Sequence, residues 1–185
     1  MPKKPKVPPP GTDGPDILNG TNRDDTIEGG LDGDEINGKN GDDSLYGDEG
    51  DDILSGGNGQ DALYGGTEND TLNGGTGKDS LFGDDGDDLL KGGQGKDWLE
   101  GGSGDDDLHG GKGKDTFAFG PDFGSDTILD FKDGKEKLDF TATGLALTDL
   151  VIDVLGVDAT ITFGTNVITV AGAAGLIDGS DFLFA

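Results

Sequence analysis

The sequence GGTGKDSLF, residues 74–82, decides the fold of this chain because its pattern recurs every nine residues. The pattern returns clearly in GGNGQDALY (56–64), GGQGKDWLE (92–100) and GGSGDDDLH (101–109). Twelve such units run from residue 11 to residue 118 without an insertion or a deletion. Every unit has glycine at its first position, aspartate at its sixth and a large apolar residue at its eighth. A disordered Gly/Asp tract does not explain this spaced apolar column, so we expect a regular fold.

Each unit divides into a turn and a short strand. Glycine reaches positive φ angles without steric cost, so the glycine-rich half can turn tightly. In the second half, such as Ser80-Leu81-Phe82, the central residue faces one side of a strand and its neighbours face the other. Two units then form one coil of 18 residues, and the coils stack as parallel strands. The predicted fold class is all-β: a right-handed parallel β-roll, or β-solenoid, of nonapeptide repeats with a β-rich C-terminal cap.

The turns of such a roll stack aspartates above one another. Asp61, Asp79 and Asp97 are 18 residues apart and therefore share one edge. Carboxylates stacked at about 4.8 Å repel each other unless a cation lies between them. Glycine turns add backbone carbonyls, and a set of roughly six to eight carboxylate and carbonyl oxygens is what Ca²⁺ requires. The chain has no cysteine and only one histidine, His109, so zinc and copper are poor candidates.

Pairing each of the twelve repeat aspartates with the residue 18 further on gives ten pairs, which is the ceiling on regular calcium sites. Some units depart from the pattern, and we expect the first three, residues 11–37, to bind most weakly. The substituted glycine positions are Thr12, Thr21, Arg23, Asp32, Lys39, Asp48, Glu68 and Asp84. The predicted calcium ligands are the side chains of Asp34, Asp43, Asp52, Asp61, Asp70, Asp79, Asp88, Asp97, Asp106 and Asp115 and the turns at Gly57, Gly59, Gly75, Gly77, Gly93, Gly95, Gly102 and Gly104.

Composition links folding to these cations. The net charge of the 185 residues is −26, and only 30% of them are hydrophobic. Residues 11–118 hold 28 acidic and 7 basic side chains, a net of −21. A chain of this composition is expected to be expanded without counterions, and an ion that binds only the folded state stabilises it. The acidity argues against nucleic acid as a partner. There is also no apolar run long enough for a transmembrane segment.

The segments on either side of the repeats differ from them. Residues 1–10, MPKKPKVPPP, read as an extended tail or linker, or as an artificial leader, and lack the apolar stretch of a signal peptide. Residues 119–185 are more apolar and are expected to cap the roll, which otherwise exposes its last coil. FGSDTILDF (123–131) and KEKLDF (135–140) predict two strands joined by a turn at 132–134. Further strands are expected at 149–157 and 159–164, and ITFGTNVITV (161–170) reads as a hairpin.

These motifs resemble the repeats-in-toxin (RTX) family of exported bacterial proteins, in which G-G-x-G-x-D-x-U-x is a calcium-binding β-roll repeat. The segment at 123–140 is similar to the strand pair that follows such repeats in serralysin-type proteases, and DFLFA (181–185) resembles a type I secretion signal. The resemblance implies calcium bound at the aspartates and glycine turns listed above. It also implies a secreted protein that passes unfolded through the type I secretion machinery and folds in extracellular calcium.

No catalytic constellation is found. One histidine cannot supply H-E-x-x-H, and none of Ser44, Ser80 and Ser103 lies in G-x-S-x-G. We therefore expect a non-catalytic module that folds on binding calcium, supports secretion and stabilises an exported protein. Two alternatives remain open. Tyr46, Tyr64 and Phe82, with Trp98 nearby, could bind a polysaccharide or a cell-surface partner, although cross-strand stabilisation is the simpler explanation. The chain could also be the C-terminal part of a secreted protease, lipase or epimerase.

Overall fold

The computed structural model describes residues 11–132, 134–155, 158–173 and 177–184. The tail at 1–10 and the last residue of the DFLFA ending lie outside these ranges, as do part of the turn at 132–134 and the end of the strand predicted at 149–157. Within them no helix is long and apolar enough to cross a membrane.

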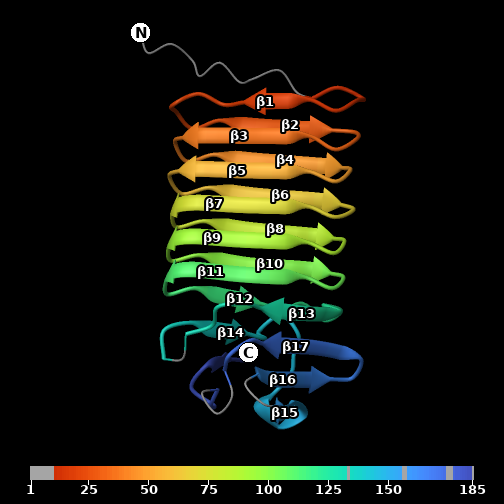
Figure 1. Ribbon diagram of the computed structural model, residues 1–185, viewed down its shortest axis with the longest axis vertical. Helices are drawn as coiled ribbons and strands as arrows, with labels where there is room; N and C mark the ends of the chain where they lie inside the picture. The colour runs from red at the N-terminus through yellow and green to blue at the C-terminus, as the bar shows by residue number, and fades with distance from the viewer. Residues whose placement is uncertain (1–10, 133, 156–157, 174–176, 185) are drawn as a thin grey trace.

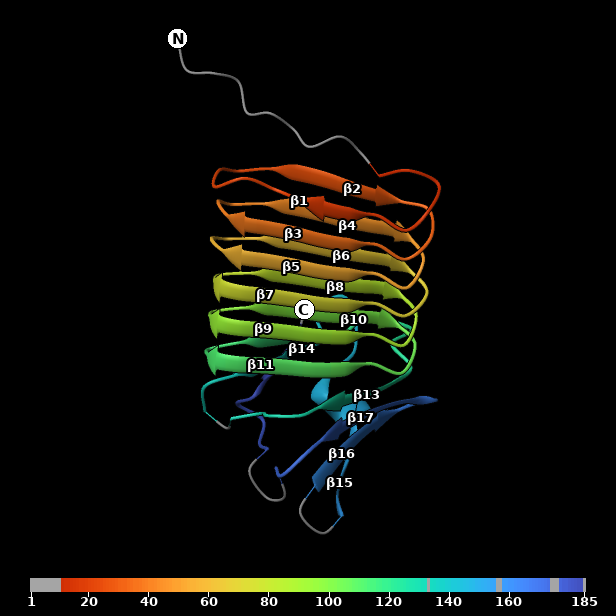
Figure 2. The ribbon, with the colours of Figure 1, turned by 45° about the horizontal axis from the view of Figure 1, so that its top comes forward.

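The first twelve strands form six coils that stack along the long axis of the molecule, and successive strands alternate between two sheets (Figure 1). Figure 2 shows the flattened cross-section, with odd-numbered strands on one side and even-numbered strands on the other. These strands are β1 (Ile17–Asn19), β2 (Thr26–Gly30), β3 (Glu35–Asn40), β4 (Ser44–Glu49), β5 (Ile53–Asn58), β6 (Ala62–Thr67), β7 (Thr71–Gly77), β8 (Ser80–Asp85), β9 (Leu89–Gly95), β10 (Trp98–Ser103), β11 (Asp107–Gly113) and β12 (Thr116–Ala118).

Strand pairing follows the nine-residue period of the sequence. Leu45 lies beside Leu63 and Leu63 beside Leu81 in parallel strands, so each residue is paired with the one 18 positions further on. The eighth-position residues form a single column between the two sheets, and all are buried. The core column consists of Leu18, Ile27, Ile36, Leu45, Leu54, Leu63, Leu72, Leu81, Leu90, Leu99, Leu108 and Phe117. The predicted right-handed parallel β-roll is confirmed.

The two sheets continue beyond residue 118, where the nine-residue period ends. Strand β13 (Ser125–Ile128) pairs with β11, and β14 (Lys137–Asp139) pairs with β12. The two strands expected at 123–131 and 135–140 therefore do not pair with each other, and each extends a different sheet. The reason is that Ile128 and Leu138, both fully buried, take the inward place that leucine holds in the repeats.

The remaining strands cover the end of the roll. Strand β15 (Val151–Leu155) pairs antiparallel with β16 (Asp158–Phe163), and β16 pairs with β17 (Asn166–Val170), which confirms the predicted hairpin. Strand β17 continues the ten-stranded sheet beside β13, and β18 (Phe182–Leu183) ends the eight-stranded sheet beside β14. A short 3₁₀ turn (Leu147–Asp149) precedes β15. Phenylalanines from several of these segments pack beneath the last coil: Phe119, Phe123, Phe140, Phe182 and Phe184.

Candidate metal centres at the two edges of the roll

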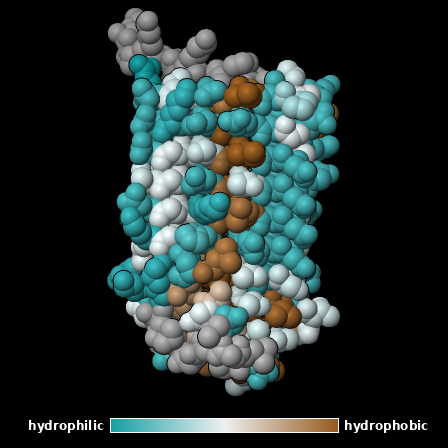
Figure 3. Space-filling model, in the orientation of Figure 1, coloured by the Kyte–Doolittle hydropathy of each residue, from teal (hydrophilic) through white to brown (hydrophobic). Residues whose placement is uncertain are grey.

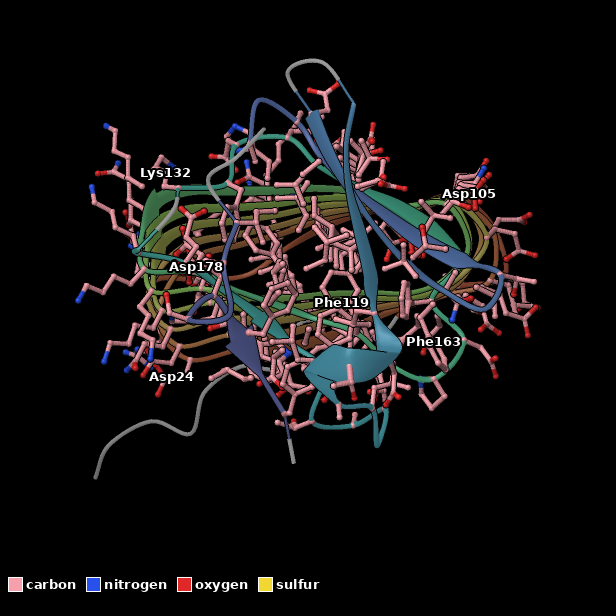
Figure 4. The ribbon with its side chains drawn as sticks, turned by 90° about the horizontal axis from the view of Figure 1, so that it is seen from below. Asp24, Asp105, Phe119, Lys132, Phe163 and Asp178 are labelled. Carbon is pink, nitrogen blue, oxygen red and sulfur yellow. The ribbon has the colours of Figure 1, made fainter. Side chains whose placement is uncertain are left out.

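The repeat aspartates lie in two columns, one at each edge of the flattened roll. We call the turns that lead into even-numbered strands the even edge and those that lead into odd-numbered strands the odd edge. A view along the axis shows Asp24 and Lys132 on the even edge and Asp105 on the odd edge (Figure 4). The even-edge column comprises Asp25, Asp43, Asp61, Asp79, Asp97 and Asp115, and the odd-edge column comprises Asp16, Asp34, Asp52, Asp70, Asp88, Asp106 and Asp126.

One oxygen of each stacked carboxylate is used inside the protein. The backbone N–H of Asp61 donates to Oδ1 of Asp79 at 3.0 Å, and the N–H of Asp79 donates to Oδ1 of Asp97 at 3.0 Å. The same bond recurs along both columns, with distances from 2.6 to 3.2 Å. It holds each accepting aspartate in a buried position against the turn of the preceding coil, with Asp79 only 1% exposed.

From Asp34 on the odd edge and Asp43 on the even edge onward, the second oxygen has no hydrogen-bond partner among the described residues. A buried polar atom without a partner costs about 1–3 kcal/mol, and a charged one costs more, so natural proteins rarely keep them. A column of such atoms therefore points to a ligand. Oδ1 of Asp25 and of Asp181 are also buried without a partner, but the column consists of Oδ2 of Asp34, Asp43, Asp52, Asp61, Asp70, Asp79, Asp88, Asp97, Asp106, Asp115 and Asp126. These include all ten predicted aspartate ligands.

Backbone carbonyls accompany the unpaired oxygens. An added Cβ at Gly83, the first residue of its unit, would lie 2.2 Å from Oδ2 of Asp88 and 2.3 Å from the carbonyl oxygen of Gly101. The carboxylate oxygen and a carbonyl of the next coil thus border the same small space. No group of three or more acidic, histidine or cysteine side chains converges within the described residues. A cation in these turns would therefore take its other ligands from carbonyls, a donor set that suits Ca²⁺.

The predicted glycines shape these turns. Gly57, Gly75, Gly93 and Gly102 have φ between 103° and 118° and stand at the second position of their units. The fourth-position residues Gly59, Gly77, Gly95 and Gly104 have φ between 139° and 157°. Side chains rarely adopt such angles, which explains the choice of glycine. Lys39, Asp48 and Asp84 at position two and Asp32 and Glu68 at position four keep the turn with φ between 62° and 80°.

The first two turns are filled by the protein itself. The N–H and Oγ1 of Thr21 both donate to Oδ2 of Asp25, at 2.6 and 2.8 Å, and Thr12 binds Asp16 in the same way. These threonines replace glycine at position two. The third unit differs, because Oδ2 of Asp34 is unpaired like those below it. Of the three units expected to bind calcium most weakly, only the first two thus use their own threonine to hydrogen-bond Oδ2 of the repeat aspartate.

Burial raises the pKa values of the stacked aspartates from Asp34 onward on the odd edge and from Asp43 onward on the even edge. The pKa of Asp70 rises to about 8, and those of Asp79 and Asp88 rise to about 7. In each case burial is the largest cause, a backbone hydrogen bond opposes it, and neighbouring aspartates add repulsion. Without a cation the folded roll therefore holds negative charge where it is unfavourable, and a divalent ion between paired carboxylates removes that penalty.

Asp126 is a site residue that the sequence analysis missed. It extends the odd edge, since the N–H of Asp106 donates to its Oδ1 at 3.2 Å, and burial raises its pKa to about 9. The spacing G-S-D-T-I at 124–128 keeps the glycine, aspartate and apolar places of a repeat. Two inserted residues separate it from the register of the repeats, because Asp106 is stacked on a residue 20 positions away.

The outer faces carry two further features. Tyr46, Tyr64 and Phe82 are stacked as predicted, with ring centroids 4.9 Å apart and planes within 7°. Trp98 lies in a neighbouring groove of about 410 Å³, together with Lys78, Lys96, Thr116 and Asp139. On the opposite sheet exposed apolar residues, including Ile17 and Ile53, form an interrupted column along the axis of the roll (Figure 3).

The sequence model of a protein family, the RTX calcium-binding nonapeptide repeat, spans four copies of the repeat and matches this chain in six overlapping windows. They cover residues 10–45, 28–63, 55–90, 64–99, 82–117 and 92–128. The chain belongs to this family. The resemblance to the RTX family is thereby confirmed, and the unpaired Oδ2 atoms lie in a calcium-binding type of repeat. A search of the curated proteins finds no match.

The solved structures similar to this RTX chain include a lipase and a subunit of an epimerase. The extracellular lipase LipA from Serratia marcescens is 22% identical over 92% of this chain, with a TM-score of 0.55, which shows a shared fold. The chain spans 40% of the length of that lipase. The AlgE6R3 subunit of the mannuronan C5-epimerase from Azotobacter vinelandii is 28% identical, with a TM-score of 0.52, over 64% of this chain and 79% of that one.

Proposed function

We propose that this RTX module folds when Ca²⁺ fills the spaces between its stacked aspartates. The observation that carries the proposal is the column of buried Oδ2 atoms without partners at both edges. Calcium would be held by these carboxylates and by turn carbonyls such as that of Gly101. When bound, it supplies positive charge inside a segment whose net charge is −21. Because the ion binds the folded state, it stabilises that state by mass action.

The unpaired oxygens suggest how many ions bind. A regular position needs two stacked aspartates that both have an unpaired Oδ2. The even edge offers four such pairs, from Asp43 to Asp115, and the odd edge offers five, from Asp34 to Asp126. We therefore propose nine ions. This count drops the Asp16 and Asp25 positions, which Thr12 and Thr21 occupy, and adds the Asp106–Asp126 position.

We further propose that the switch serves export. In low cytosolic calcium the acidic repeats would stay expanded, which suits passage through the type I secretion machinery. Higher calcium outside the cell would then fold the roll and stabilise the exported protein. The acidic composition and the DFLFA ending support this role. A non-catalytic role also fits residues 11–184, since no H-E-x-x-H or G-x-S-x-G motif occurs in the sequence.

Far-UV circular dichroism during a calcium titration tests the proposal. Trp98 is the only tryptophan and follows the stacked Asp97 directly, so its fluorescence reports the roll locally. We expect a cooperative gain of β structure with calcium, and little gain with an equal concentration of magnesium, which prefers a rigid octahedral site. A chain that is fully folded in chelator would contradict calcium-triggered folding.

A second candidate function is binding of a polysaccharide or a cell-surface partner. The flat stack of Tyr46, Tyr64 and Phe82 favours it, as does the groove that Trp98 lines together with Lys78 and Lys96. Screening the calcium-loaded protein on a glycan array tests this function. Binding that is lost in Trp98→Ala and kept in Tyr46→Ala would assign it to the groove, and the absence of any binding would leave cross-strand stabilisation as the role of the stack.

A further inference from the structure

The even edge ends differently from the odd edge. Strand pairing places Thr116 beside Lys137, so Glu136 takes the place below Asp115 in the even-edge column. The Glu136 side chain is fully buried. Nζ of Lys132 lies 3.2 Å from Oε1 of Glu136 and 3.3 Å from Oδ2 of Asp130. This position therefore already contains a cation.

Three acceptors hold the Lys132 ammonium. It donates to the backbone carbonyl of Gly111 at 2.5 Å, in addition to the carboxylates of Asp130 and Glu136. Asp130 is fixed in turn, because it accepts the N–H groups of Gly110 and Gly111, each at 2.9 Å. A glycine-turn carbonyl combined with carboxylates is the same donor chemistry as in the regular positions. Burial acts to lower the pKa of Lys132, but Glu136 and Asp130 outweigh it and raise the pKa, so the group stays charged.

We propose that Gly111, Asp130 and Glu136 form one more cation site of the even edge, which the Lys132 ammonium occupies and which binds Ca²⁺ only when that side chain is removed. This inference rests on the proposed calcium function of the other positions. It explains why the even edge offers four open positions and the odd edge five. The lysine side chain is 40% exposed, so an ion from solvent can reach the site once the ammonium is gone.

The other end of the even edge supports the same reading independently. There Nζ of Lys39 donates to the carbonyl of Gly20 at 2.9 Å, while Thr21 satisfies Oδ2 of Asp25. At both ends of the even edge, a lysine ammonium group thus donates a hydrogen bond to a turn carbonyl. At the lower end of the odd edge, by contrast, Oδ2 of Asp126 has no partner among the described residues.

Counting bound calcium by native mass spectrometry of the full chain tests the inference. We expect Lys132→Met to bind one ion more than the wild type at saturating calcium. Lys114→Met is the matched control, because Lys114 is an exposed lysine on the same edge, and it should leave the count unchanged. Adding Glu136→Gln to Lys132→Met should remove the extra ion, since it takes away one of the two carboxylates.

The single variant Glu136→Gln decides the question even if Lys132→Met does not fold. If lysine occupies the site, Glu136→Gln binds as many ions as the wild type. A loss of one ion in Glu136→Gln would show that calcium occupies the site already and would overturn the inference. An unchanged count in folded Lys132→Met would overturn it as well. A wild-type chain that binds no calcium would instead contradict the proposed function itself.

Discussion

Replacing Asp79 with alanine should weaken calcium-dependent folding far more than the same change at Asp16. Asp79 belongs to two stacked pairs, with Asp61 above it and Asp97 below it, and its Oδ2 is unpaired. Asp16 is at the start of the odd edge, and Thr12 already occupies its Oδ2. Asp79→Ala therefore removes a ligand from two proposed calcium positions, while Asp16→Ala removes a ligand from none.

The contacts give the size of the difference. A site saturated at 100 times its dissociation constant stabilises the folded state by about 2.7 kcal/mol, so losing two sites costs about 5 kcal/mol. Asp79→Ala also leaves the buried N–H of Asp61 without its acceptor, which costs about 1–3 kcal/mol more. Asp16→Ala loses the two bonds from Thr12, a cost of about 1 kcal/mol, as for a helix-capping aspartate.

Urea unfolding at saturating calcium and the calcium midpoint of folding, both followed by circular dichroism, measure these effects. We expect the Asp79→Ala midpoint to move to clearly higher calcium and the Asp16→Ala midpoint to stay near that of the wild type. Equal midpoints for the two variants would refute the assignment of the unpaired oxygens as ligands.

Three further predictions follow from the same geometry. In chelator, acidification from pH 8 to pH 4 should favour the folded roll, because the raised pKa values of Asp70, Asp79 and Asp88 mean that the folded state takes up protons before the unfolded state does. In calcium the same acidification should destabilise the folded roll, because protons compete with calcium for the carboxylates. Circular dichroism under both conditions checks these opposite signs. Gly83→Ala should abolish binding at its position, since the new Cβ would lie 2.2 Å from Oδ2 of Asp88, whereas Gly120→Ala, with open space around it, should bind the wild-type number of ions by native mass spectrometry. Tyr64→Ala removes two stacked contacts at 4.9 Å and should lower the free energy of unfolding by about 2 kcal/mol, while Tyr46→Ala, which removes one, should lower it by about half as much in urea unfolding.

The repeat register was predictable because three residue types recur at fixed spacing. An eighth-position residue such as Leu63 must face the core, and this places Asp61 at the adjoining turn and stacks it on Asp79. The stacked Tyr46, Tyr64 and Phe82 followed from the same period of 18. Strictly repeated spacing thus fixes both the core and the position of the candidate ligands.

The ends of the aspartate columns could not be predicted from the repeat spacing. Asp126 is separated from the repeats by two inserted residues, so its stacking on Asp106 depends on how the chain returns to the sheet. Whether Thr21 donates to the carboxylate of Asp25, or Lys132 donates to the carbonyl of Gly111, depends on side-chain directions that the repeat pattern does not specify. The sequence therefore predicts the regular positions, and the structure is needed to see which positions the chain fills by itself.

The most direct test of the account is a crystal structure of the protein grown in calcium, with anomalous differences measured to locate the ions. The account predicts a calcium ion between each of the nine aspartate pairs with unpaired Oδ2 atoms and the Lys132 ammonium in place at the end of the even edge. Ordered turns without calcium between Asp61, Asp79 and Asp97 would contradict it.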